Sequence, residues 1–233
     1  MRQTCDVLRG FMVLLGFWWG VSSSICHAVS YTMTFDLTPL ATQPTPPGPF
    51  ALDFQLIDGE GVVRNTVTLS NFAFGTGGGP TGSVTTAGGA RGNLSGTVII
   101  TDSGVLNEFT QGFTPSGTTP LRFTVDLTTN VEPVTPDAFS VAIFDSAGIG
   151  LATSFFDVFA QIDISTPLTI HTYASDPHVT PPGCLTCPPI ALNAPSIQSI
   201  TAPVPEPLTL GLFGTGLVGI ALVRWWRQCH RLL

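Results

Sequence analysis

The chain has 233 residues, of which 10% are charged and 43% are hydrophobic, and it contains 25 Gly and 20 Pro. This much Gly and Pro excludes a helical bundle, the lack of a Gly-X-Y period excludes collagen, and the apolar fraction excludes wholesale disorder, so a loop-rich β protein is expected. Between residues 29 and 206, three Arg stand against fourteen of the fifteen acidic residues. This region lacks the basic cluster needed to neutralise phosphates, which excludes nucleic acid as a partner.

The first 28 residues have the pattern of a secretory signal peptide. Two Arg lie among the first ten residues, and the apolar run over residues 11–21 is too short to span a bilayer. Cys26 and Ala28 place small side chains at the −3 and −1 positions of a cut before Val29, which predicts processing by signal peptidase. A lipoprotein signal and an uncleaved anchor are the alternatives. The protein is therefore expected to be exported.

Residues 29–174 are predicted to form an all-β ectodomain. Residues 29–37 alternate apolar and polar side chains, as a half-buried strand does. Residues 58–61 predict the turn of a hairpin between the strands on either side, and the Gly-rich residues 75–92 predict a long exposed loop. About eight short strands with wide loops indicate a two-sheet β-sandwich, jelly-roll-like. The predicted strands cover residues 29–37, 50–57, 62–74, 94–101, 121–128, 138–144, 155–164 and 168–173.

No catalytic group is predicted in the ectodomain. The exported part offers only His171 and His178 as bases for a Ser-His-Asp hydrolase, and no Gly-x-Ser-x-Gly turn presents a nucleophile. Asp102-Ser103-Gly104 resembles the active-site loop of aspartic proteases, but its single copy favours a hairpin turn. Ca²⁺ is an alternative role for the acidic residues at predicted strand ends, although their spacing favours solvated carboxylates, so no metal and no cofactor is predicted. These residues are Asp36, Asp53, Asp58, Glu60, Asp126, Asp137 and Asp145.

Residues 175–203 are rich in Pro and predict a stiff, extended stalk. Cys184 and Cys187 lie in this segment, and in an oxidising compartment they are expected to form a local disulfide. A redox site is an alternative that the two Pro after Cys187 disfavour, because a helix cannot follow there. A zinc site is another alternative, but only two His lie near and four ligands are needed. The end of the segment, residues 196–201, is alternatively an edge strand of the sandwich.

The C-terminal segment combines a Pro-Glu-Pro tripeptide, an apolar helix and a basic tail. Pro205, Glu206 and Pro207 lead into residues 208–223, which carry no charge. As a helix these sixteen residues reach roughly 24 Å, and flanking Arg and Trp side chains make up the difference from a hydrocarbon core of about 30 Å. The segment therefore predicts a membrane anchor. The tail after it predicts, by the positive-inside rule, that this end stays in the cytoplasm with the acidic domain outside; its basic residues are Arg224, Arg227 and Arg231.

These three parts, in this order at residues 202–233, resemble the PEP-CTERM sorting signal. The resemblance implies an exosortase as partner, a membrane protein of Gram-negative bacteria understood to cleave its substrate near the motif and pass it to the cell surface. Residues 204–233 would then form the sorting signal, with Pro205, Glu206 and Pro207 as its motif. An ordinary tail anchor is the alternative.

The ectodomain itself resembles, through residues 48–59, 65–74 and 107–110, a domain shared by one group of PEP-CTERM proteins. That group has no established biochemical activity, so the resemblance implies no site residues. The expected function is that of a non-catalytic protein of the cell surface or extracellular matrix, associated with exopolysaccharide or biofilm. The alternatives are a carbohydrate-binding module, in which Tyr31, Tyr173 and Phe side chains would supply the aromatic platform, and a secreted hydrolase.

Overall fold

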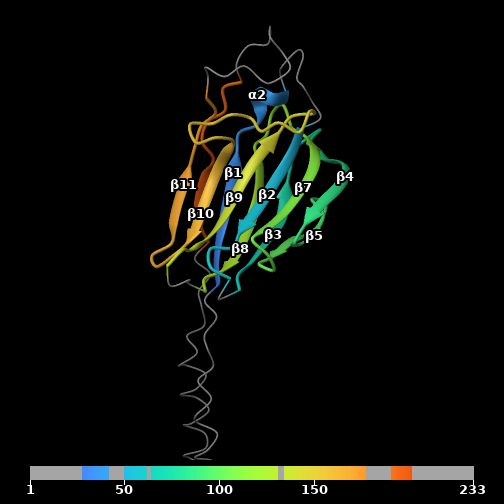
Figure 1. Ribbon diagram of the computed structural model, residues 1–233. Helices are drawn as coiled ribbons and strands as arrows, with labels where there is room; N and C mark the ends of the chain where they lie inside the picture. The colour runs from blue at the N-terminus through green and yellow to red at the C-terminus, as the bar shows by residue number, and fades with distance from the viewer. Residues whose placement is uncertain (1–27, 42–49, 62–63, 131–133, 177–189, 201–233) are drawn as a thin grey trace, which may run out of the picture. The chain divides into compact units, whose positions relative to one another are not determined.

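The computed structural model describes residues 28–41, 50–61, 64–130, 134–176 and 190–200 (Figure 1). These residues form antiparallel strands and one short helix, α2 (Thr38–Ala41). Sheet A has the strand order β12-β1-β8-β3-β6-β5, and sheet B has the order β11-β10-β9-β2-β7-β4. The strands are β1 (Ala28–Phe35), β2 (Phe50–Ile57), β3 (Thr66–Ala73), β4 (Gly79–Ala87), β5 (Gly89–Gly92), β6 (Val98–Thr101), β7 (Leu106–Thr114), β8 (Leu121–Thr128), β9 (Asp137–Phe144), β10 (Val158–Ile164), β11 (Thr169–Thr172) and β12 (Ser196–Ser199).

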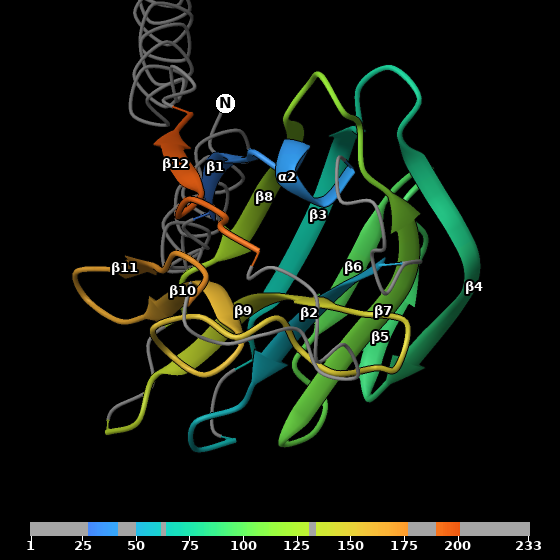
Figure 2. The same ribbon diagram turned by 90° about the horizontal axis from the view of Figure 1, so that it is seen from above.

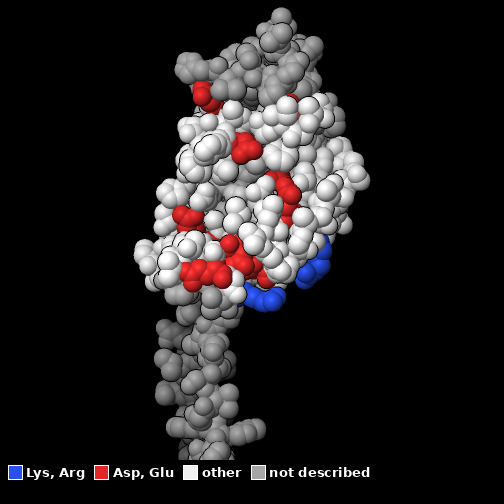
Figure 3. Space-filling view, in the orientation of Figure 1, with Lys and Arg blue, Asp and Glu red and all other residues white. Residues whose placement is uncertain are grey.

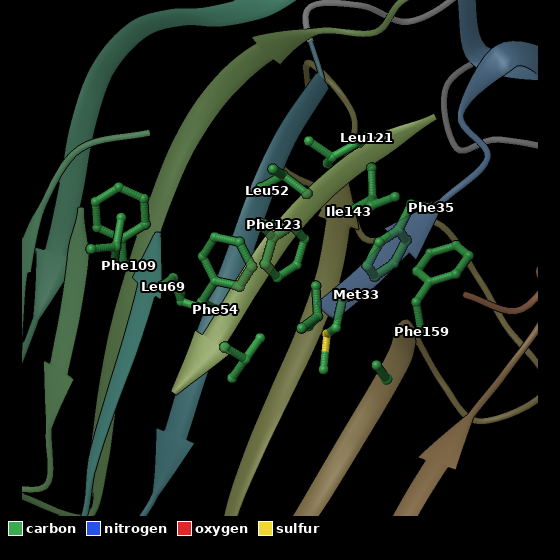
Figure 4. Close-up of a cluster of buried hydrophobic side chains, with 14 of the residues drawn as sticks. Met33, Phe35, Leu52, Phe54, Leu69, Phe109, Leu121, Phe123, Ile143 and Phe159 are labelled. Carbon is green, nitrogen blue, oxygen red and sulfur yellow. The ribbon is translucent and has the colours of Figure 1, made fainter. Parts of the chain in front are cut away.

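The two sheets pack face to face around a core rich in Phe (Figures 2 and 4). Because side chains alternate along a strand, β2 directs Phe50, Leu52, Phe54 and Leu56 into the core and its other residues outward. Strand β8 does the same from the opposite sheet, and its Phe123 meets Phe54 with ring centroids 5.5 Å apart. The predicted all-β, two-sheet sandwich is confirmed.

The predicted hairpin across residues 58–61 is wrong. Strand β2 pairs with β7 and β9 in sheet B, whereas β3 pairs with β6 and β8 in sheet A. The connection crosses from one sheet to the other, and Gly59 N donates to Asp137 Oδ1 at 2.9 Å at the start of β9. Alternation shows that each strand has one apolar face, but it does not distinguish strands that lie side by side from strands that face each other across a core.

The predicted loop over residues 75–92 is also wrong, because this segment contains β4 and β5. Strand β4 extends the edge of sheet B by pairing with β7, and β5 extends the edge of sheet A by pairing with β6. Glycine allows the close backbone approach, because a Cβ on Gly89 would lie 2.1 Å from the Thr101 carbonyl oxygen. Gly92 likewise has a φ of +112°, a conformation that favours glycine.

The described part of the Pro-rich segment packs on the sandwich. Ile190 and Leu192 are buried in the core, and Ser175 Oγ donates to the Ile190 carbonyl oxygen at 2.6 Å. Strand β12 then pairs with β1 at the edge of sheet A, as the edge-strand alternative predicts. Among the described residues, no helix has the length and apolar character to cross a membrane. The predicted membrane helix over residues 208–223 lies outside them.

Candidate functional site

Many of the side chains that the sequence singles out lie outside the described residues. This holds for the sorting motif, the basic tail, the two exported cysteines and one of the two exported histidines. The disulfide therefore stays a prediction. The residues concerned are Pro205, Glu206, Pro207, Arg224, Arg227, Arg231, Cys184, Cys187 and His178.

Four ring side chains form a row on the sandwich at the β11 edge of sheet B, and we call them the aromatic row: Phe155, Phe156, His171 and Tyr173. The His171 and Tyr173 rings are stacked at 6.3 Å, and the Tyr173 and Phe155 rings are stacked at 5.0 Å. Phe156 meets Phe155 edge to face at 5.3 Å. Residues 171 and 173 share a face because they are two apart in an extended chain. The turn before β10 adds the two Phe rings.

The turn that carries the two Phe is held by backbone hydrogen bonds. Thr153 N donates to the Phe156 carbonyl oxygen at 2.7 Å, and Ser154 N donates to the Ala174 carbonyl oxygen at 3.2 Å. Phe156 has a φ of +57° and its side chain is 81% exposed. A bulky residue in this left-handed region is uncommon and costs about 1–2 kcal/mol. The turn therefore presents an aromatic ring to solvent in a backbone conformation that is uncommon for a bulky residue.

Polar side chains of β10 lie beside the row. Gln161 pairs with His171 across the two strands, so the two side chains share the outward face, while Ile162 and Ile164 point into the core. Gln161 Nε2 donates to Asp163 Oδ1 at 2.6 Å, and His171 Nε2 lies 3.9 Å from Asp163 Oδ2. Rings flanked by an amide, a carboxylate and an imidazole offer apolar faces together with hydrogen-bonding groups, as a binding site for a polar ligand requires.

The sequence identified only part of this row. Tyr173 is in it, but Tyr31 packs against the core, and burial raises the pKa of its phenol. Phe155 and Phe156 fell within a predicted strand over residues 155–164, whereas β10 begins at Val158. Two adjacent aromatic residues cannot both face the core of a strand, and this was the signal that at least one is exposed.

A second polar group lies on the outward side of β2 and β7. Asp53 points away from the core yet has 0% exposure. Its Oδ1 accepts a hydrogen bond from Thr110 Oγ1 at 2.8 Å, and its Oδ2 accepts one from Gln55 Nε2 at 2.7 Å. Burial, reinforced by the charge of Glu108, raises the pKa of Asp53 to about 7. The folded protein therefore holds a proton here at pH values where an exposed Asp has lost it.

We expect this proton to make the protein less stable as the pH rises. Between pH 3.8 and about 7 the folded state keeps the proton of Asp53 and the unfolded state loses it, so raising the pH favours unfolding, by about 1.4 kcal/mol for each pKa unit separating the two states. Asp53→Asn resembles the protonated form and should flatten this dependence. Urea unfolding at pH 5 and pH 8 measures how the free energy of unfolding changes with pH. Asp36→Asn, at an exposed carboxyl, is the control. An equal change with pH in Asp53→Asn and in the parent would contradict the assignment of the raised pKa to Asp53.

The Asp102-Ser103-Gly104 segment connects β6 to β7. These strands belong to different sheets, so the segment is a turn between sheets and the predicted hairpin turn is wrong. Asp102 is buried rather than presented to solvent. Acidic side chains are distributed over the face of sheet B seen in Figure 3, and the basic side chains on view lie along its lower edge.

Comparison with known proteins identifies the C-terminal segment. Residues 203–227 match the family described as PEP-CTERM protein-sorting motif. The matched span includes Pro205, Glu206 and Pro207 together with Arg224 and Arg227. Neither the curated proteins nor the solved structures that were compared gave a match. The C-terminus of this chain is therefore a PEP-CTERM sorting motif, and the chain is an exosortase substrate that is exported and sorted to the cell surface.

Proposed function

We propose that this protein is a non-catalytic component of the cell surface or extracellular matrix whose sandwich binds exopolysaccharide through the aromatic row. Sorting by an exosortase supports a location at the cell surface, because it brings the domain to the place where exopolysaccharide lies. In this proposal signal peptidase removes residues 1–28, and the C-terminal helix holds the protein in the inner membrane only in transit.

The exposed row is the observation that carries the polysaccharide proposal. Aromatic rings have a negative face that attracts the polarised C–H groups of a sugar ring, and they bury a large apolar area. Gln161 and Asp163 add an amide and a carboxylate at the edge of the rings, which suit sugar hydroxyl groups. The acidic surface disfavours acidic polymers, so a neutral polysaccharide is the better partner.

A non-catalytic role is supported by the burial of Asp53, one carboxyl of a neighbouring pair. Asp53 and Glu108 are the described carboxyl groups that most resemble the acid and base of a glycosidase, because one has a raised pKa beside the other. The Asp53 carboxyl is sealed from solvent, so a glycosidic bond cannot reach it. The secreted hydrolase is accordingly the weaker alternative.

A glycan array with the purified exported protein tests the proposal. We expect binding to neutral oligosaccharides, and Phe156→Ala and Tyr173→Ala should each weaken it about tenfold, equivalent to about 1.4 kcal/mol. Val105→Ala removes apolar surface from an exposed side chain in the β6–β7 connection and is the control, because it should bind like the parent. Absence of glycan binding, or equal binding by the row variants, would refute the polysaccharide role without affecting the sorting motif.

A further inference from the structure

The pairing register of sheet B aligns hydrogen-bonding side chains across its strands. One residue from each of β11, β10, β9, β2 and β7 takes part, and each is the direct cross-strand partner of the next. We call them the polar line: His171, Gln161, Ser140, Gln55 and Glu108. Because neighbouring strands lie about 4.8 Å apart, the line crosses the sheet over a length of about 19 Å.

The polar line lies on the outward side of sheet B. Phe54, Phe109 and Phe139 each precede a residue of the line in the chain, and all three have 0% exposure in the core. Side chains alternate along a strand, so the residues of the line project away from the core. This is the face of the sandwich seen in Figure 3. The line is therefore placed where a partner from solvent can lie along it.

The polar line dips where it crosses β9. Ser140 has a short side chain and is 8% exposed, whereas its partners Gln161 and Gln55 are longer and half-buried. The strands that carry the two Gln are about 10 Å apart, on either side of β9. Within the described part of the chain, Ser140 Oγ makes no hydrogen bond. A nearly buried hydroxyl without a partner points to a polar ligand that is bound at the dip.

The two amides beside the dip are oriented and still have free acceptor atoms. Gln161 Nε2 donates to Asp163 Oδ1 at 2.6 Å. Gln55 Nε2 donates to Asp53 Oδ2 at 2.7 Å and to Glu108 Oε1 at 3.3 Å. These bonds fix the amide planes, but neither Oε1 atom accepts a hydrogen bond from a described residue. The two oxygens are thus available to hydroxyl groups of a ligand.

The charge of sheet B selects an uncharged ligand. Its six strands are all described, and they carry acidic side chains but no Lys or Arg. A polyanion would meet repulsion there without any compensating contact. The polar line itself offers two amides, a hydroxyl, an imidazole and a single carboxylate. Such a set suits a neutral chain with many hydroxyl groups, which both donate and accept hydrogen bonds.

The polar line is continuous with the aromatic row. His171 belongs to both, and its ring stacks on that of Tyr173 at 6.3 Å. A sugar chain whose one end lies on the aromatic row therefore meets Gln161 next and then the dip at Ser140, without leaving the face of sheet B.

We propose that the ligand is a linear neutral polysaccharide, which lies across sheet B along the polar line. One sugar lies on the aromatic row, and a later one lies over Ser140 between Gln161 and Gln55. This inference rests on the proposed function, for which the aromatic row alone would suffice. It adds that the site binds an extended stretch of several sugars rather than the end of a chain.

The dependence of affinity on ligand length tests the inference. Isothermal titration uses the full chain in a detergent without a sugar headgroup, with the disaccharide and the hexasaccharide of linear glucan, mannan, xylan and galactan. In the class that binds, the hexasaccharide should bind about tenfold more tightly than the disaccharide, because it alone reaches the far strands. Equal affinities would overturn the polar line and leave the aromatic row as the site. No binding by any of them would contradict both proposals.

Variants locate the path of the ligand. Gln55→Ala should lower the affinity for the hexasaccharide about tenfold and leave the disaccharide unaffected, because β2 lies about 14 Å from β11. Tyr173→Ala should weaken both ligands. Gln198→Ala is the matched control, since this exposed Gln lies on β12 of sheet A and its loss should change neither affinity. If Gln55→Ala does not fold, Glu108→Ala on β7 decides. Parent-like hexasaccharide binding by the folded variants of the polar line would overturn the inference.

Discussion

Replacement of Pro205, Glu206 and Pro207 by Ala is expected to leave the protein inserted with its domain outside the cytoplasm, yet to abolish its shortening and its transfer to the surface. Membrane insertion depends on the apolar residues 208–223, and orientation depends on the basic tail, so neither needs the tripeptide. The tripeptide contributes only to recognition, and its loss should therefore block a later step. We expect shortening and transfer to be lost completely rather than slowed.

Fractionation of cells and immunoblotting measure this effect. The variant should remain at its full precursor length in the inner-membrane fraction, whereas the parent is shortened and leaves it. Replacement of Pro181 and Pro182 by Ala, outside the matched residues 203–227, is the control and should be sorted like the parent. A triple variant that is shortened and transferred like the parent would show that the segment is a plain tail anchor.

Phe54→Ala is expected to destabilise the sandwich by about 3–5 kcal/mol, the range for removing a fully buried Phe. Phe54 has 0% exposure, and its ring lies 5.5–6.4 Å, centroid to centroid, from the rings of Phe72, Phe109, Phe123 and Phe139. These partners come from both sheets, so the cavity would open where the layers meet. Such a loss is a large share of the 5–15 kcal/mol typical of a domain.

Urea unfolding of Phe54→Ala and Phe156→Ala compares the loss of a buried Phe ring with the loss of an exposed one. Both changes remove the same ring, but Phe156 is exposed, so its loss should change the free energy of unfolding by no more than about 0.5 kcal/mol. Similar losses for the two variants would contradict the core described above.

The sequence predicts strands well where alternation is unbroken. The bounds of β2 and β8 agree with the predicted residues 50–57 and 121–128, because every inward position of these strands is apolar. Strand β7 escaped prediction because its inward positions include Asn107 and Gln111, which break the apolar pattern. Both are satisfied inside, Gln111 by accepting a hydrogen bond from Leu94 N at 2.8 Å. Such partners become known only with the fold.

The candidate sites differ in the same way. The sorting motif is contiguous, so its residues could be read directly from the sequence. The convergence of Asp58, Asp102 and Asp137 and the proximity of Asp53 to Glu108 depend on which strands are neighbours and on their register, such as Gln55 opposite Glu108. The acidic residues were recognised individually as possible Ca²⁺ ligands, but nothing in their spacing could select three of them. Sheet pairing makes that selection.

The mass of the surface form of the protein tests the sorting account most directly. Protein recovered from the surface of parent cells should lack the C-terminal helix expected over residues 208–223, and deletion of the exosortase should leave a chain that still contains these residues in the inner membrane. Intact mass spectrometry of both fractions distinguishes these forms. Surface protein that retains Leu233, or equal shortening in cells without the exosortase, would contradict the account.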